Sequence, residues 1–99
     1  QKKGLSVQGF QVSSNPVVSN EKVTFEVNGE GVNEVKVAVF NLNGDQLYDS
    51  GFVSGHSVSW NATTRSGQPL SNGIYLFRMA AKGSGEIVSS EVRKLLVIK

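Results

Sequence analysis

Hydrophobic and polar residues alternate along most of the chain with the period of two that is typical of β-strands. The pattern predicts seven strands, which cover residues 5–12, 22–28, 34–41, 47–50, 56–61, 74–82 and 86–98. No stretch repeats apolar residues at the spacing of an amphipathic helix. Short strands separated by turn residues are typical of two packed sheets. We therefore expect an all-β, immunoglobulin-like or fibronectin-III-like sandwich of about seven antiparallel strands.

The parity of the apolar positions predicts which side chains face the core. The first strand changes parity at Gly9, which indicates a β-bulge or a strand that switches sheets. Tyr75 follows a turn and begins a strand, so we expect a tyrosine corner in which its hydroxyl bonds to loop backbone. The residues expected to point inward are Val23, Phe25, Val27, Val35, Val37, Val39, Val58, Trp60, Tyr75, Phe77 and Met79.

Turn residues mark the connections between the strands. Asn43-Gly44 predicts a type I′ hairpin turn, because both residues tolerate positive φ. Residues 51–55 and 83–85 are expected to be loops, and the last strand is expected to run unbroken over residues 86–98. Asn15-Pro16 should interrupt a ladder, because proline has no N–H to donate.

Length, charge and composition narrow the class of protein. The chain has 99 residues and no cysteine, which fits one domain without disulfides or thiolate metal sites. Its net charge is +2 and its basic residues are scattered, so we expect no nucleic-acid binding. No apolar run is long enough to span a membrane as a helix. Because the chain starts at Gln1 without a signal peptide, we expect residues 1–99 to be a single domain, a C-terminal fragment of a larger protein.

The sequence offers no catalytic set, so we expect no enzyme, no cofactor and no metal. His56 is the only histidine, and no serine sits in a G-x-S-x-G elbow. Asp45 and Asp49 are the only aspartates and fall on one face of a hairpin. A solvated hairpin face is the favoured interpretation there, and a weak calcium site completed by loop carbonyls is the alternative. Asn61 begins an N-x-T glycosylation triplet, which would matter only in a glycosylating host.

Aromatic side chains give the chain one way of binding a ligand. Exposed aromatic rings stack on sugars, so a carbohydrate- or protein-binding module would use Tyr48, Phe52 and Trp60. Trp60 is in phase with Val58, which favours a position in the core instead. Tyr48 and Phe52 are then the aromatic residues expected to be exposed.

From Val35 onward the sequence resembles a known family. The resemblance rests on the V-x-V-x-V-F-N-L-N-G run of residues 35–44, on Trp60-Asn61, on the S-G-Q-P-L-S-N-G-I-Y run of residues 66–75, and on the terminal K-L-L-V-I-K of residues 94–99. This order is similar to the FlgD-type Ig-like domains and to the related C-terminal sorting domains of the type IX (Por) secretion system, which also share the upstream Asn-Pro. The family often has Trp-Asp-Gly where this chain has Trp60-Asn61-Ala62, and the Cβ of alanine disfavours positive φ.

The resemblance implies a function but no catalytic residues. It implies a non-catalytic accessory or structural module of a secreted or cell-surface bacterial protein, which acts as a C-terminal spacer, stabilising, assembly or sorting domain. Its implied partners are the neighbouring domains of the same polypeptide and the secretion or surface-assembly machinery. The sequence does not separate a sorting signal from a spacer, because both have the same fold.

Overall fold

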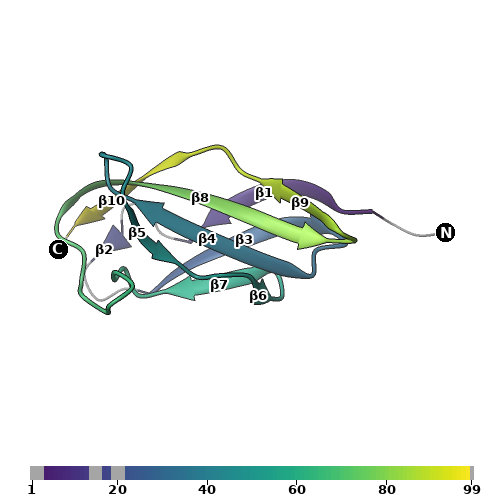
Figure 1. Ribbon diagram of the computed structural model, residues 1–99, viewed down its shortest axis with the longest axis horizontal. Coiled ribbons are helices and arrows are strands. Elements are labelled where there is room, and N and C mark those ends of the chain that lie inside the picture. Colours follow the sequence, from purple (N-terminus) through teal and green to yellow (C-terminus); the bar gives the residue numbers. More distant parts are fainter. Residues whose placement is uncertain (1–3, 14–16, 19–21, 99) are drawn as a thin grey trace.

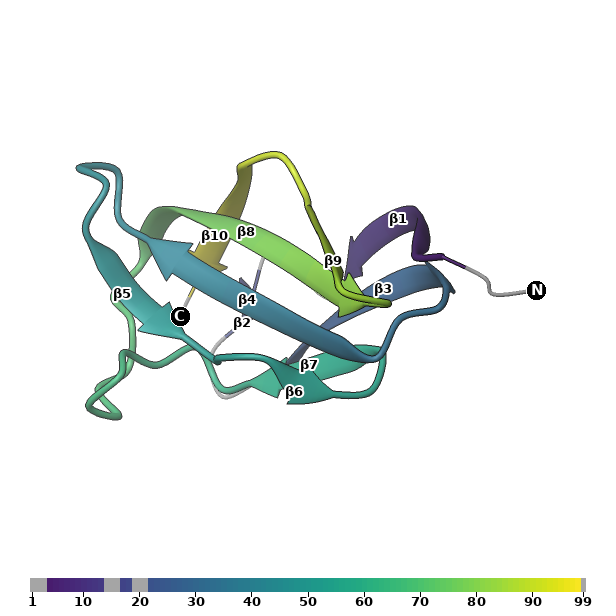
Figure 2. The same cartoon turned by 45° about the vertical axis from the view of Figure 1, so that its right-hand side comes forward.

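The computed structural model describes residues 4–13, 17–18 and 22–98, which form two β-sheets packed face to face (Figures 1 and 2). The smaller sheet has the strand order β1-β3-β7, and the larger has the order β2-β10-β8-β4-β5, with β6 also bonded to β4 and β9 to β8. This arrangement is the expected all-β sandwich. The strands are β1 (Ser6–Val12), β2 (Val17–Val18), β3 (Val23–Glu30), β4 (Glu34–Phe40), β5 (Gln46–Asp49), β6 (Val53–Ser54), β7 (Ser57–Trp60), β8 (Gly73–Gly83), β9 (Glu86–Ser89) and β10 (Arg93–Ile98).

The core lies between the sheets and contains the residues that the apolar alternation predicts. Phe25 of β3 is at its centre, with its ring centroid 5.2 Å from that of Phe77 and 6.0 Å from that of Trp60. Of the inward-pointing residues predicted, only Tyr75 is half-buried and the others are buried. Its hydroxyl donates to the carbonyl oxygen of Ser71 at 2.8 Å, which confirms the predicted tyrosine corner.

The predicted irregularity in the first strand is a β-bulge. The register of β1 against β3 shifts between Val7 and Gly9, so Val7 pairs with Gly29 and Gly9 with Asn28. The strand stays in one sheet. The break predicted at Asn15-Pro16 lies outside the described residues.

Three strands end at a serine that extends the ladder with its side chain. Ser13 follows β1, Ser50 follows β5 and Ser90 follows β9. Each serine donates its own N–H to a cross-strand carbonyl, and its Oγ accepts the N–H of the same partner residue, at 2.9–3.0 Å. The hydroxyl thus takes the place of the serine's own carbonyl, which would accept this N–H in a regular antiparallel pair, and the chain turns away without leaving the N–H of the partner unpaired.

The last strand is divided, contrary to the expectation of one strand over residues 86–98. Ser90 is 6% exposed, and its Oγ bonds both the N–H of Met79 and the carbonyl of Glu91. Residues 90–92 therefore leave the ladder, and the chain re-enters it as β10. Alternation of residue types cannot show that a side chain takes over a ladder hydrogen bond.

Two short strands were not expected. β6 lies inside the predicted loop 51–55, where Val53 pairs with Val35. β2 pairs with β10 in parallel, an exception to the antiparallel arrangement. Strands of two residues are too short for a period to be recognised, so only the partner strand reveals them.

The turn at Asn43-Gly44 differs from its prediction in the residues that take positive φ. In Asn43-Gly44 only Gly44 has positive φ (91°), because the side chain of Asn41 holds the turn by accepting the N–H groups of Asn43 and Asp45. A type I′ turn needs two such residues, so that prediction is wrong. The pair with both is Ser84-Gly85, at 52° and 75°.

The structure also keeps the turn after Trp60 despite its alanine. Ala62 has φ of 58°, the left-handed conformation that its Cβ disfavours. Its carbonyl oxygen accepts the N–H of Leu70 at 3.0 Å, and its side chain packs against the core. These contacts hold the alanine in place.

Candidate functional site

The predicted ligand-binding aromatic residues lie on different sides of the larger sheet. Trp60 is 3% exposed, its indole N–H donates to the carbonyl of Thr63 at 2.9 Å, and the ring of Tyr48 stacks on it at 5.4 Å. Tyr48 is half-buried and pairs with the buried Val39, so it belongs to the inner face, and the expectation that it is exposed is wrong. The predicted core position of Trp60 is confirmed, and its ring is not open to a ligand.

Phe52 lies on the opposite, outer face of the same sheet. It is half-buried, and the ammonium groups of Lys36 and Lys82 lie 5.6 and 5.4 Å from its ring centroid. Cation–π contacts of this kind hold the ring against the sheet. Since Tyr48 and Phe52 face opposite sides, the three aromatic residues do not form one platform. A ligand-binding role for any of them stays a prediction.

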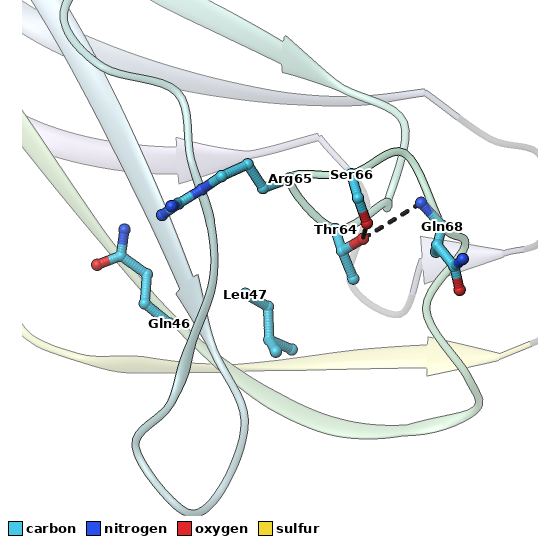
Figure 3. A pocket seen from close by; sticks show the side chains of 6 residues that line it. All are labelled: Gln46, Leu47, Thr64, Arg65, Ser66 and Gln68. Carbon is cyan, nitrogen blue, oxygen red and sulfur yellow. Dashed lines mark hydrogen bonds between the residues drawn. The ribbon is translucent and has the colours of Figure 1, made fainter.

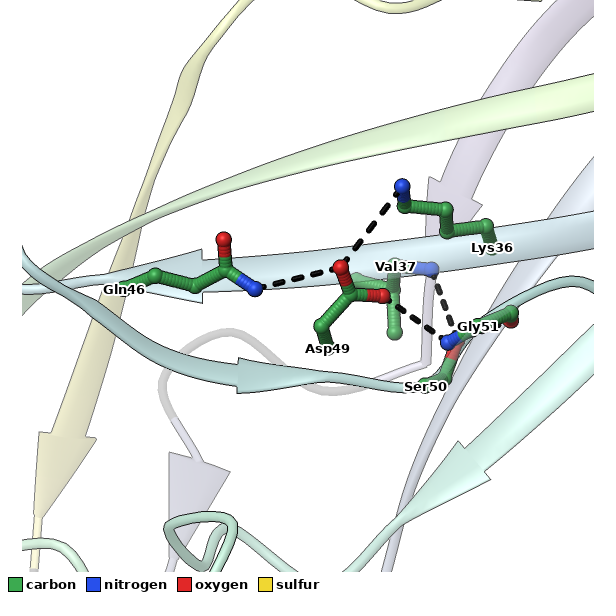
Figure 4. Close-up of polar contacts among 6 residues, drawn as sticks. All are labelled: Lys36, Val37, Gln46, Asp49, Ser50 and Gly51. Atoms are coloured by element: carbon green, nitrogen blue, oxygen red, sulfur yellow. Dashed lines mark hydrogen bonds and ion pairs between the residues drawn. The ribbon is translucent and has the colours of Figure 1, made fainter.

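The carboxylate of Asp49 has three polar partners on the outer face (Figure 4). It accepts the N–H of Gly51 at 2.8 Å and the side-chain amide of Gln46 at 3.1 Å, and it lies 3.6 Å from Nζ of Lys36. Burial alone would raise the pKa of Asp49, but the hydrogen bond from Gly51, the charge of Lys36 and the bond from Gln46 together lower it. The network ties the edge strand β5 to β4.

The hydrogen bonds of the two aspartates argue against the alternative calcium site, because Asp45 and Asp49 have separate partners. Asp45 accepts the side-chain amide of Asn41 at 3.2 Å in the hairpin turn, away from the partners of Asp49. Within the described part of the chain, no three His, Asp or Glu residues gather closely enough to hold one metal ion. His56 is exposed, and its backbone carbonyl accepts the N–H of Val27.

A hollow of about 480 Å³ opens between β5 and the loop of residues 62–70 (Figure 3). The hydroxyls of Thr64 and Ser66 are used within the loop, because Oγ1 of Thr64 accepts the N–H of Gln68 and also bonds the hydroxyl of Ser66. The N–H of Arg65 donates to the carbonyl of Leu47, which fastens the loop to β5.

A smaller hollow, of about 230 Å³, lies on the outer face of the larger sheet. Ala38, Ala80 and Ser89 line it with small side chains. The charged residues that line it are Lys36, Asp49 and Arg78, and the first two form an ion pair. Small residues at neighbouring positions of three strands leave a depression that longer side chains would fill.

Beyond this hollow, the outer face becomes apolar. Leu96 pairs with Ile74 and Ile98 pairs with Val18, so their four side chains are neighbours on one side of β2, β10 and β8. Their exposed fractions are 50% for Val18, 46% for Ile74, 38% for Leu96 and 43% for Ile98. We call these four residues the C-terminal apolar face. An exposed apolar cluster of this kind often marks an interaction site.

Sequence reasoning missed the C-terminal apolar face, although it left a signal. Residues 95–98 are all apolar, whereas a half-buried strand alternates. The structure buries Leu95 and Val97 and exposes Leu96 and Ile98. An unbroken apolar run in a strand with only one covered face therefore indicates a second apolar surface.

Solved structures that resemble this chain place it among Ig-like sandwich domains. The chain matches dimeric latent PorU from Porphyromonas gingivalis with a TM-score of 0.72 at 22% identity. This match covers 95% of the present chain and 9% of PorU. It matches PorZ, described as an essential bacterial surface component of the type-IX secretion system of the same organism, with a TM-score of 0.64 at 22% identity, over 92% of this chain and 12% of PorZ. CopC from Methylosinus trichosporium OB3b follows with a TM-score of 0.59 at 14% identity, over 95% of this chain and 93% of CopC.

The family follows from a sequence match. Residues 14–97 match the model of the secretion system C-terminal sorting domain, and the chain belongs to that family. No curated protein matches the sequence. The chain spans about a tenth of the length of PorU and PorZ, so it corresponds to a small part of each. The relation to type IX sorting domains that the sequence motifs suggested is confirmed, whereas the resemblance to FlgD-type domains stays a prediction.

Proposed function

We propose that this domain is the C-terminal sorting address of a longer secreted or cell-surface bacterial protein, which the type IX secretion machinery recognises. The observation that carries the proposal is the family match over residues 14–97. In this proposal, residues 1–99 are one module of the larger polypeptide, and the catalytic or binding activity of that polypeptide resides in its other domains. A sorting role requires a surface to be recognised and no catalytic group.

The position of the last strand supports recognition of a folded domain. β10 lies between β2 and β8, and its Leu95 and Val97 belong to the core. The C-terminal residues are therefore integrated into the sandwich, and their outward side chains are presented at fixed positions. The described part of the chain contains no helix that is long and apolar enough to span a membrane.

The test is removal of the domain from the full-length parent protein in a bacterium with a type IX system. We expect the truncated parent to stay in the cell, whereas the intact parent reaches the surface or the medium. Fractionation with immunoblotting would measure this, and a cell without a functional type IX system should retain the intact parent as well. Equal export of truncated and intact parent would contradict the proposal and leave a spacer role.

A further inference from the structure

The outer face of the larger sheet is divided into two unlike halves. In the half near β6 and β9, opposite charges are close: Lys36 lies 3.6 Å from Asp49, and Lys82 lies 4.0 Å from Glu34. The half near β2 holds the C-terminal apolar face, which the half-buried Leu76 of β8 extends toward β4. The charges of the first half are therefore paired within the domain, whereas the apolar side chains of the second half are in contact with water.

Basic side chains stand at the border between the two halves. Arg78 stands two residues from Leu76 on β8 and so on the same face, and Lys94 pairs directly with Leu76. Both basic side chains are exposed. Among the described residues, no carboxylate forms a salt bridge with Arg78, and the acidic residues of this face are engaged by Lys36 and Lys82.

The hollow of about 230 Å³ lies at this border and gives it shape. Arg78 lines it together with Ala38 and Ala80, so a side chain of a partner could enter between the small residues and meet the guanidinium group. Asp49 and Lys36 also line the hollow, and because these two are paired at 3.6 Å, the positive charge of Arg78 is left uncompensated there. A guanidinium binds a carboxylate through two parallel hydrogen bonds. The surface thus combines an apolar area, a positive border and a recess.

We propose that this surface docks a protein of the secretion machinery whose contact area combines aliphatic side chains with carboxylates, one of which enters the hollow beside Arg78. Complementary charge is the argument for that partner. A second copy of the chain fits less well, because packing the same surfaces would bring the positive borders of Arg78 and Lys94 together. A membrane surface fits less well, because the four exposed side chains are aliphatic and interfacial anchors are usually aromatic.

This proposal rests on the proposed sorting function. The experiment is designed so that failure of the docking proposal can be distinguished from failure of the sorting function. In the full-length parent, Ile74→Lys and Leu96→Lys each place a charge in the apolar area at an exposed strand position. Ile87→Lys is the matched control, because Ile87 is 58% exposed at the other end of the sheet. We expect the first two variants to reduce the secreted fraction at least tenfold, and the control to be secreted like the original.

A charge-reversal pair tests the positive border. Arg78→Glu should reduce the secreted fraction, because it repels the carboxylate of the partner. Arg65→Glu, on the exposed loop of residues 62–70, should not. The melting temperature of each purified variant domain shows whether a loss of secretion comes from loss of the fold. If one of Ile74→Lys and Leu96→Lys does not fold, the other still tests the apolar area.

Four results would overturn the proposal. If removal of the domain stops secretion while Ile74→Lys, Leu96→Lys and Arg78→Glu are secreted normally, the sorting function stands and this surface is not its docking site. Binding to phosphatidylglycerol vesicles that Ile74→Lys abolishes would assign the surface to lipid. A dimer in sedimentation equilibrium that Ile74→Lys dissociates would assign it to a second copy. If the truncated parent is secreted, the sorting function fails and this proposal fails with it.

Discussion

Gly83 ends β8 where the backbone of another segment passes very close. A Cβ on Gly83 would overlap the carbonyl oxygen of Gly31 and lie 3.0 Å from the carbonyl carbon. The φ of Gly83 is outside the positive range, so its requirement is for space and not for an unusual backbone conformation. Alanine at this position therefore tests how closely the two segments are packed.

The size of the expected stability loss depends on the group that the new methyl group would meet, which is a backbone carbonyl. Overpacking a dense interior costs about 1–3 kcal/mol, and the upper end applies here because a backbone carbonyl cannot rotate away as a side chain can. We expect Gly83→Ala to lower the free energy of unfolding by about 3 kcal/mol, from a total of about 5–15 kcal/mol for a domain of this size. The melting temperature should fall by about 12–24 °C.

Urea denaturation followed by the fluorescence of Trp60 measures this, because the indole is buried in the core. Two other glycines are controls, since a Cβ on either would meet nothing within 4 Å. Gly9→Ala adds a methyl group without strain and should stabilise the domain by about 0.4–1 kcal/mol, because alanine lowers the conformational entropy of the unfolded chain. Gly44→Ala should cost about 1 kcal/mol, because Gly44 has φ of 91°. A loss for Gly83→Ala no larger than that for Gly44→Ala would refute the argument from close packing.

Three further substitutions probe single hydrogen bonds and one charge. Ser90→Ala should destabilise the domain by about 1–2 kcal/mol, because it leaves the buried N–H of Met79 unpaired, and hydrogen exchange at that amide should accelerate. Tyr75→Phe removes the bond from the tyrosine hydroxyl to loop backbone and should cost about 1 kcal/mol in urea denaturation, with an unchanged m-value. Asp49→Asn should cost up to about 1 kcal/mol near neutral pH. Since the folded state lowers the pKa of Asp49, the stabilisation is complete above the ordinary aspartate pKa of about 3.9 and is lost as the pH falls through the folded-state pKa. Denaturation curves of this variant and the original should therefore converge toward about pH 2, and a constant difference between them would contradict the role of the charge.

The sequence predicts the core far better than the surface. Residues such as Phe25 and Phe77 repeat every second position, and that local signal is sufficient to place them between two sheets. Tyr75 was also placed correctly, because its turn and its strand are adjacent in the sequence. Properties that depend on a few neighbouring residues are accessible without a structure.

Features that depend on distant segments were not accessible. The division of the last strand comes from Ser90 bonding to Met79, and the parallel strand β2 is visible only from its pairing with β10. The C-terminal apolar face needs three strands to be placed side by side before Ile74 and Leu96 become neighbours. The candidate docking surface could therefore not be predicted from the sequence, because the sequence does not show which of its residues become neighbours.

The serine-terminated strands have a consequence for how the sandwich is aligned. β8 pairs with β10 over residues 73–77 and with β9 over residues 80–83, while β4 has β5 and β6 as separate neighbours on its other side. Ser90 and Ser50 mark the points at which one neighbour stops. Along one side, β8 and β4 are thus each hydrogen-bonded to two short strands. The register of each short strand against the central strand is set separately. A one-residue slip in one segment would exchange the inner and outer side chains of that segment alone, and the rest of the sheet would keep its alignment.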